Sequence, residues 1–332
     1  MSAISNYIRS FYDVIKDTID GFSEYKILKK SSSLAYITVF SLAPLLLVIL
    51  FICDVFWGRE AIEGAIYAQM KDFIGPLAAE QIQLMIQNLA LSPNSTIAGV
   101  IGIGTLIFAA TSVFAEIQDS INTIWSLRPR KRSGIWLFIK ARLLSFGVIG
   151  SLGFIVLVAL GFSTLVDGIS NQLAVTYSEI SVGFIYLSNI FVTFIITSLL
   201  FGAIFTILPD ADITWKQVRV AAFTTTILFM LGKFLILFYI SNSNISDVYG
   251  AAGSIVVLMV WVYYSSVILY LGATFAKCYA VKFAEPIKPS KYAEIVQYIA
   301  ITSEAKTIQK ASEEIKELKK EKEICIDDIK KN

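Results

Sequence analysis

The stretch GAAGSIVVLMVWVYYSSVILYLGATFAKCYAV, from Gly250 to Val281, decides the fold. Among its residues only Lys277 belongs to the group Asp, Glu, Lys and Arg. An apolar run of about 18 or more residues is long enough to cross the hydrocarbon core of a bilayer as a helix. The stretch therefore predicts a transmembrane helix that is long enough to tilt or to extend beyond the membrane.

The rest of the chain has the same character. Of its 332 residues, 56% are hydrophobic and 16% are charged, with a mean hydropathy of +0.68; soluble domains carry about 25% charged residues. Because these runs lack the alternating pattern of barrel strands, we predict an all-α fold, a polytopic integral membrane helical bundle. Its six transmembrane helices are expected at Leu34–Phe56, Thr96–Ala115, Leu143–Val166, Ile180–Leu208, Val220–Ile240 and Gly250–Val281.

The distribution of Lys and Arg predicts the orientation of these helices. The N-terminal arm, the second and fourth loops and the C-terminal tail together hold 24 of the 28 Lys and Arg residues, whereas the other loops hold 2. Positive residues gather on the cytoplasmic side of membrane proteins. Both termini are therefore expected in the cytoplasm.

Three regions follow from this reading: a cytoplasmic amphipathic arm (1–30), a six-helix membrane domain (31–285) and a charged cytoplasmic tail (286–332). The first outer loop, Trp57 to Ser95, shows helical hydrophobic spacing on both sides of Gly75-Pro76, which predicts two amphipathic helices. The tail carries SEEIKELKKEK (Ser312–Lys322), typical of a solvated helix, although a helix that binds a partner has the same pattern.

Composition excludes several classes of function. The chain has no histidine, and its three cysteines, Cys53, Cys278 and Cys325, lie far apart, so neither a metal site nor another cofactor is expected. No phosphate-binding G-x-x-x-x-G-K-[ST] motif occurs, which argues against ATP hydrolysis. The sequence shows no basic face with interleaved aromatic residues outside the membrane, so binding to nucleic acid is not expected. We therefore expect a protein that is not an enzyme.

Two residues inside the predicted spans are candidates for a pathway. Pro44 lies near the middle of the first span and frees the carbonyl group of Phe40 from its helical hydrogen bond. Such a proline either makes a packing kink or bends a helix that borders a pathway. Lys233 lies about 10 Å inside the fifth span, counted along the helix axis. Its ammonium group either reaches outward to the interface or handles a substrate or ion.

Three further candidates are polar residues in or near spans. Asp247 precedes the last span, where it either caps the helix or provides a functional charge. Tyr249 lies beside it as a belt residue at the membrane interface or as part of the same site. Asn189, in the fourth span, suits a hydrogen bond between helices or a contact to a ligand.

A polar cluster is predicted where the helix of the second span continues along the cytoplasmic face. Glu116 and Asp119 share one side of this helix, and Arg128 and Arg130 follow closely in the sequence. Paired carboxylates can serve acid–base chemistry. The nearby arginines favour ion pairing as their use.

Four segments, in this order, carry a resemblance to a known family: SLAYITVFSLAPLLLVIL (Ser33–Leu50), FAEIQDSINTIW (Phe114–Trp125), LPDADITWKQVRVAAF (Leu208–Phe223) and DVYGAAGSIVVLMVWVYYSSVILYLGATFA (Asp247–Ala276). Together they resemble the YihY/BrkB family of bacterial inner-membrane proteins, over roughly residues 31 to 282. Matching positions are Pro44, Asp119, Asn122, Trp125, Pro209, Trp215, Asp247, Tyr249 and Gly250.

The resemblance implies a six-spanning protein of the bacterial cytoplasmic (inner) membrane. Members have been named for serum resistance and once for a ribonuclease, and transport of lipids, envelope precursors or ions has been suggested for the family. We expect a multi-pass protein that is transporter- or permease-like and does not hydrolyse ATP. Its expected partners are membrane lipids and a small-molecule, lipid or ion substrate, and its oligomeric state is left open. The alternative is a non-catalytic membrane scaffold that organises other proteins.

Overall fold

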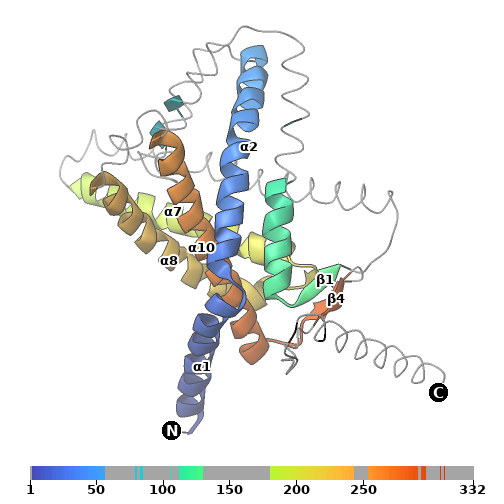
Figure 1. The fold of residues 1–332 in the computed structure, drawn as a ribbon. Helices are drawn as coiled ribbons and strands as arrows, with labels where there is room; N and C mark the ends of the chain where they lie inside the picture. Colours follow the sequence, from blue (N-terminus) through green and yellow to red (C-terminus); the bar gives the residue numbers. More distant parts are fainter. Residues whose placement is uncertain are drawn as a thin grey trace. The chain divides into compact units, whose positions relative to one another are not determined.

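The structure is a computed structural model, and it describes residues 2–56, 79–80, 83–84, 105, 112–129, 180–242, 253–290, 293–296, 307 and 310. Five long helices carry the fold (Figure 1): α1 (Ser2–Glu24), α2 (Ile27–Phe56), α7 (Ile180–Ile207), α8 (Trp215–Asn242) and α10 (Gly253–Phe283). Residues 112–124 form a further helix.

Three of these helices are long and apolar enough to cross a membrane. The stretches are Ile190–Ile207 in α7, Trp215–Ile236 in α8 and Ile255–Phe283 in α10. They fall in the regions predicted for the fourth, fifth and sixth spans. The first predicted span lies in α2, which is one continuous helix through Pro44. The third predicted span, most of the second, and nearly all of the first outer loop lie outside the described residues.

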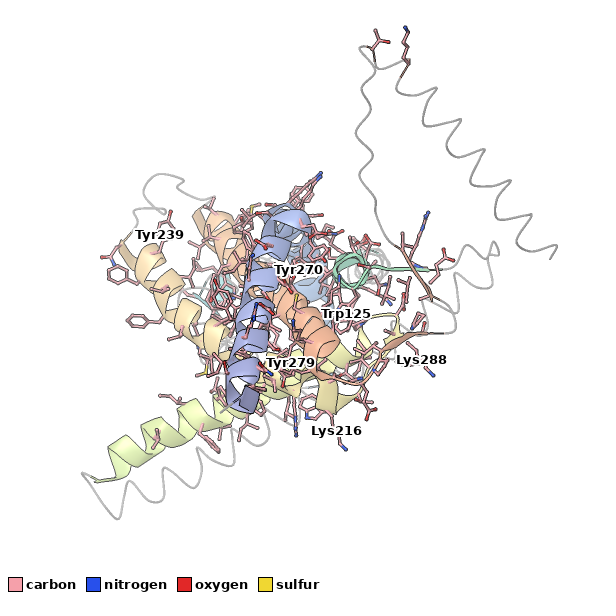
Figure 2. The ribbon with its side chains drawn as sticks, turned by 90° about the horizontal axis from the view of Figure 1, so that it is seen from below. Trp125, Lys216, Tyr239, Tyr270, Tyr279 and Lys288 are labelled. Carbon is pink, nitrogen blue, oxygen red and sulfur yellow. The ribbon has the colours of Figure 1, made fainter. Side chains whose placement is uncertain are left out.

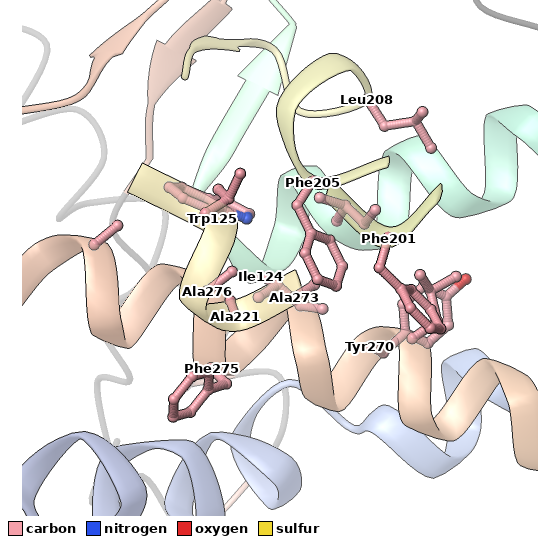
Figure 3. Packing of buried hydrophobic residues seen from close by; sticks show 14 of the residues in the cluster. Ile124, Trp125, Phe201, Phe205, Leu208, Ala221, Tyr270, Ala273, Phe275 and Ala276 are labelled. Atoms are coloured by element: carbon pink, nitrogen blue, oxygen red, sulfur yellow. The ribbon is translucent and has the colours of Figure 1, made fainter. Parts of the chain in front are cut away.

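Helix α10 is the centre of the packing. It contacts α1, α2, α7 and α8, and its fully buried residues include Tyr270, Ala273 and Ala276. Figure 3 shows the ring of Phe205, from α7, directed toward α10 beside Ala273. Small residues on α10 thus allow large residues of the neighbouring helices to approach closely.

Four short strands join the connections between helices. β1 (Leu127–Pro129) pairs antiparallel with β4 (Ala293–Ile295), and β2 (Ala211–Asp212) pairs antiparallel with β3 (Lys288–Pro289) (Figure 1). These strands correct the expectation of a purely α fold. The reason is that the segment after α10 pairs its backbone with two other connections, so that their polar groups are satisfied where they pack on the helix ends.

The start of α8 is fixed by its own sequence. Thr214 precedes the helix, and the amide oxygen of Gln217 accepts hydrogen bonds from the Thr214 backbone N–H (2.7 Å) and hydroxyl group (3.0 Å). This is one half of a capping box, in which the side chain of the third helical residue satisfies the backbone donor of the residue before the helix. The Gln217 amide nitrogen also donates to the carbonyl oxygen of Glu285 (3.1 Å). One side chain therefore ties the start of α8 to the segment that follows α10.

The chain separates into two compact units. The first contains Met1–Ile295 and the second contains Val296–Asn332. Residues 286–295, which the sequence analysis places in the tail, therefore belong to the first unit with the bundle, through strands β3 and β4. The predicted N-terminal arm is also part of this unit, because α1 packs on α10.

Candidate functional site

One group of described polar side chains links different helices where the connections between them meet. We define this polar junction as the side chains of Tyr25, Gln118, Asn122, Ser126, Asp210 and Lys277. They come from the turn between α1 and α2, the 112–124 helix and its end, the α7–α8 connection, and α10. The junction contains one carboxylate and one ammonium group, and its other members are neutral.

Asp210 lies at the centre of the first half of the junction. Its carboxylate accepts hydrogen bonds from the amide nitrogens of Asn122 (2.8 Å) and Gln118 (3.1 Å). Its backbone N–H donates to the amide oxygen of Asn122 (2.8 Å), and its carbonyl oxygen accepts from the backbone N–H of Ser290 (2.9 Å). Asp210 therefore holds together the 112–124 helix, the α7–α8 connection and the chain beside β3.

The surroundings of Asp210 change its acidity. Burial raises the pKa of the carboxyl group above its ordinary value of 3.8, because the charged form loses solvation. The hydrogen bonds from Asn122 and Gln118 favour the charged form and oppose this rise, but burial is the larger effect. The neutral amides thus offset part of the cost of burying the charged form.

This raised pKa predicts how stability depends on pH. Below 3.8 the carboxyl group is protonated in both the folded and unfolded states, so burial carries no charge penalty. As the pH rises through the folded pKa, the folded protein must ionise a buried group and loses stability. We therefore expect the difference in melting temperature between wild type and Asp210→Asn to be largest near pH 4 and to narrow toward about pH 7. Thermal unfolding in detergent measures it, and a difference that widens with pH would contradict the prediction.

Lys277 lies at the centre of the second half of the junction. Its ammonium group donates hydrogen bonds to the hydroxyl oxygens of Tyr25 (2.8 Å) and Ser126 (3.1 Å). The same nitrogen lies 4.8 Å from the centroid of the Tyr25 ring, within the range of a cation–π contact. Within the part of the chain that the structure describes, no carboxylate pairs with Lys277.

Two further polar groups are buried close to the junction. The hydroxyl group of Tyr270, a fully buried residue of α10, faces Ser120 without a hydrogen bond of standard geometry. The indole N–H of Trp125, just after the 112–124 helix, is also buried without a described partner. Figure 2 shows Trp125 and Tyr270 among the helices, while the exposed Lys216 and Lys288 lie nearer the edge.

The residues predicted as a pathway are not brought together by the described part of the structure. Lys233 is half-buried on α8 and has an interaction partner. Pro44 and Asn189 lie in α2 and α7, but their side chains are outside the described set. Asp247 and Tyr249 lie outside the described residues, so the choice between a cap and a functional charge at Asp247 stays a prediction.

The predicted cytoplasmic cluster is described only in part, so its ion pairing stays a prediction. Glu116 and Asp119 lie on the 112–124 helix, and among the described residues neither forms an ion pair with Arg128. Instead, Arg128 lies in β1 directly across from Glu294 of β4, a cross-strand pair of opposite charge. Arg130 lies outside the described residues.

The two charged members of the junction were not among the residues predicted as a site. Asp210 follows Leu208-Pro209, a motif too short to be specific, and Lys277 lies near the end of its span, where a lysine commonly reaches the interface. A signal for Lys277 was present, since it is the sole charged residue in the stretch from Gly250 to Val281. Asn122, which holds Asp210, was among the matched motif positions.

Comparisons with known proteins agree on one family. The family described as "Virulence factor BrkB" matches residues 18–294, which include every member of the polar junction. No solved structure matches the chain.

Named relatives extend this match. A UPF0761 membrane protein of Psychromonas ingrahamii is 30% identical over 242 residues, covering 72% of this chain and 78% of the relative. A UPF0761 membrane protein of Haemophilus influenzae is 26% identical over 257 residues, covering 77% of this chain and 90% of the relative. Another, from Pseudoalteromonas atlantica, is 27% identical and covers 77% of this chain and 82% of the relative.

Proposed function

The chain belongs to the BrkB family and is a multi-pass membrane protein, and from this premise we propose that it moves an amphiphile through the membrane without hydrolysing ATP. The substrate class is a lipid or a lipid-linked envelope precursor. The bacterial inner membrane is the proposed site of action, with the polar junction on its cytoplasmic side. The chain contains no histidine, the usual general base near neutral pH, and the proposal includes no covalent step.

One observation carries the proposal: an acidic and a basic side chain, Asp210 and Lys277, lie at the end of a membrane bundle, each held by neutral partners. Removing a charge from water is costly unless a partner compensates for it. Neutral residues of similar shape would hold these helix ends together without that cost. Charges that persist at such positions therefore favour a role in handling a charged group over a role in packing alone.

The surface of the helices supports contact with lipid. Large apolar side chains of α7 and α8 are exposed, among them Phe191 at 62%, Phe234 at 72% and Leu235 at 65%. Exposed apolar surface of this kind is disfavoured in water and is suited to a hydrocarbon surround. An amphiphile can thus keep its tails in lipid while its polar group passes along the bundle.

A scaffold remains the second candidate because the chain has a separate second unit, Val296–Asn332. A flux assay separates the two functions. The full chain and a chain that ends at Ile295 are placed in phospholipid vesicles that carry a fluorescent phospholipid. A reductant added outside destroys the fluorescence of the outer leaflet, and the rate at which fluorescence of the inner leaflet is then lost measures the exchange of lipid between leaflets.

For a transporter, we expect both forms to speed the exchange of lipid between leaflets about tenfold or more over protein-free vesicles. ATP should have no effect, and Thr123→Ala, a variant outside the junction, should match the wild type. Exchange no faster than in protein-free vesicles, for both a zwitterionic and an anionic fluorescent phospholipid, would reject transport of lipid.

A further inference from the structure

Lys277 lies close to the end of a helix that is long and apolar enough to cross a membrane. It lies within the span Ile255–Phe283, six positions before Phe283, which corresponds to about 9 Å along the helix. Its side chain is half-buried. The ammonium group is therefore partly buried in the bundle near the end of the helix, the end that we expect to meet the headgroups of one leaflet.

The coordination of this ammonium group is incomplete. Lysine has three N–H donors, and two of them point to the hydroxyl groups of Tyr25 and Ser126. Within the described part of the chain no carboxylate neutralises the charge. A cation with one donor left over and neutral neighbours attracts an anion of matching size.

The two hydroxyl partners are held by an unusual backbone. Lys26, which follows Tyr25, has φ 52°, and Ser126 itself has φ 58°. Among the described residues these are the two non-glycine positions with a left-handed backbone. Glycine suits such helix-end positions best, because a Cβ atom is strained there. Ser126 has a side chain despite this strain, and the hydroxyl oxygen of that side chain accepts the hydrogen bond from Lys277.

The exposed charges next to the site are of both signs, since Glu24 precedes Tyr25 and Glu294 lies across from Arg128, so the ammonium group of Lys277 is the charge that an anion would meet in the site itself. Lys26 and Arg128 are both exposed and are neighbours in sequence of Tyr25 and Ser126. The excess of Lys and Arg predicts that this end faces the cytoplasm, where leaflets carry anionic phospholipids. Hydroxyl groups can also donate to phosphate oxygens once they turn from Lys277 toward a ligand.

We propose that Lys277, Tyr25 and Ser126 form a binding site for a phosphate group, carried by an anionic phospholipid or by a soluble phosphate ester. The site rests on the proposed function in that it names the polar group of the amphiphile, but binding itself requires no transport. Lys277 supplies the charge, and the two hydroxyl groups orient the phosphate oxygens.

The test measures binding in detergent, where no flux occurs. The full chain is titrated with phosphatidylglycerol, with phosphatidylcholine and with inorganic phosphate, and bound lipid is counted by native mass spectrometry. We expect phosphatidylglycerol to bind to the wild type more tightly than phosphatidylcholine. If inorganic phosphate displaces phosphatidylglycerol, the site recognises the phosphate group alone. If inorganic phosphate does not displace phosphatidylglycerol, the site recognises the lipid.

Variants locate the site. Lys277→Gln should weaken phosphatidylglycerol binding about tenfold or more, because a hydrogen bond to a charged group is lost. Ser126→Gly, which suits the left-handed backbone, and Tyr25→Phe, which keeps the ring, should each weaken binding about threefold to tenfold. Lys282→Gln is the matched control, since Lys282 is on the same helix but is exposed and paired with Asp13 (3.0 Å).

The outcomes separate this site from the proposed function. Lys277→Arg retains the positive charge and should bind within about threefold of wild type, which guards against a fold defect in Lys277→Gln. The proposed site would be overturned if Lys277→Gln and Lys282→Gln weakened phosphatidylglycerol binding equally. It would also be overturned if the wild type bound phosphatidylglycerol and phosphatidylcholine equally. Lipid exchange that fails while Lys277-dependent binding persists rejects transport and leaves the site standing.

Discussion

Replacing Asn122 with aspartate is expected to destabilise the protein by about 3 kcal/mol at neutral pH. The Asn122 amide nitrogen donates to the Asp210 carboxylate at 2.8 Å. In the variant that donor is lost, and a second carboxylate takes its place beside the first. A hydrogen bond to a charged group contributes about 1.5–3 kcal/mol, and repulsion between the carboxylates adds to its loss. Chemical or thermal unfolding in detergent measures the effect.

Three comparisons identify the cause of this loss. Near pH 5 the two carboxyl groups can share a proton, so the Asn122→Asp variant should regain part of its stability. Asn122→Ala removes both hydrogen bonds between the two residues but adds no charge, so it should regain less stability near pH 5 than Asn122→Asp does. Thr123→Ala is the control, because the Thr123 hydroxyl group donates to the carbonyl of Asp119 in its own helix and links no other element. An Asn122→Asp variant as stable as Thr123→Ala would refute the argument.

Exchanging the two residues offers a stricter test. In the double variant Asn122→Asp with Asp210→Asn, the amide and carboxylate trade places. The new amide nitrogen at position 210 can donate to the new carboxylate at 122, and the backbone N–H of residue 210 keeps an acceptor. We expect the double variant to be more stable than Asn122→Asp alone, since residues in contact do not contribute additively. No recovery would mean that geometry, rather than charge, holds the junction.

The helices were predictable because their signals are local. The lengths and composition of the apolar runs place α7, α8 and α10 within a few residues of where they lie, since a span is defined by contiguous residues. The continuation of the second helix past its span was predicted from the spacing of Ile117, Ile121 and Ile124, and residues 112–124 are helical. Both inferences need no knowledge of distant segments.

The polar junction was not predictable because its contacts join distant parts of the chain. Asn122 and Asp210 are separated by 88 positions, and Tyr25 and Lys277 by 252. No periodicity relates residues so far apart, and strands of two or three residues, such as β2 and β3, are too short to show alternation. Single polar residues can therefore be recognised as one cluster only when the fold is known to place them side by side.

The glycine residues also show which contacts can be predicted from neighbouring residues and which cannot. The pair Ser198 and Gly202, four positions apart, is a pattern that lets helices approach closely. In the structure, Ser198 does make such a contact, donating to the Thr226 hydroxyl of α8 at 3.0 Å. Gly202, however, receives the ring of Trp215 from the start of α8, and a Cβ atom there would overlap it. The pattern predicted close approach but not which group approaches.

Gly272 has no room for a side chain between two buried neighbours. A Cβ atom there would overlap the Thr225 hydroxyl oxygen and lie 2.6 Å from its methyl carbon and 3.0 Å from the ring of Phe205. Both neighbours are buried, Thr225 at 1% and Phe205 at 0% exposure, so neither can move aside without disturbing the core. Overpacking a core costs about 1–3 kcal/mol, more than the gain of about 1 kcal/mol from replacing a helical glycine by alanine.

We therefore expect Gly272→Ala to destabilise the protein by about 2 kcal/mol in unfolding measurements. Gly202→Ala is the matched control, because Trp215 is 40% exposed and can swing outward, so this variant should stay within about 0.5 kcal/mol of wild type. Adding Thr225→Ala to Gly272→Ala removes both of the nearest Thr225 atoms and should restore part of the loss. If Gly202→Ala proves the more damaging of the two, then the α8 start is the rigid element, and the packing of α10 against α8 is the part that adapts.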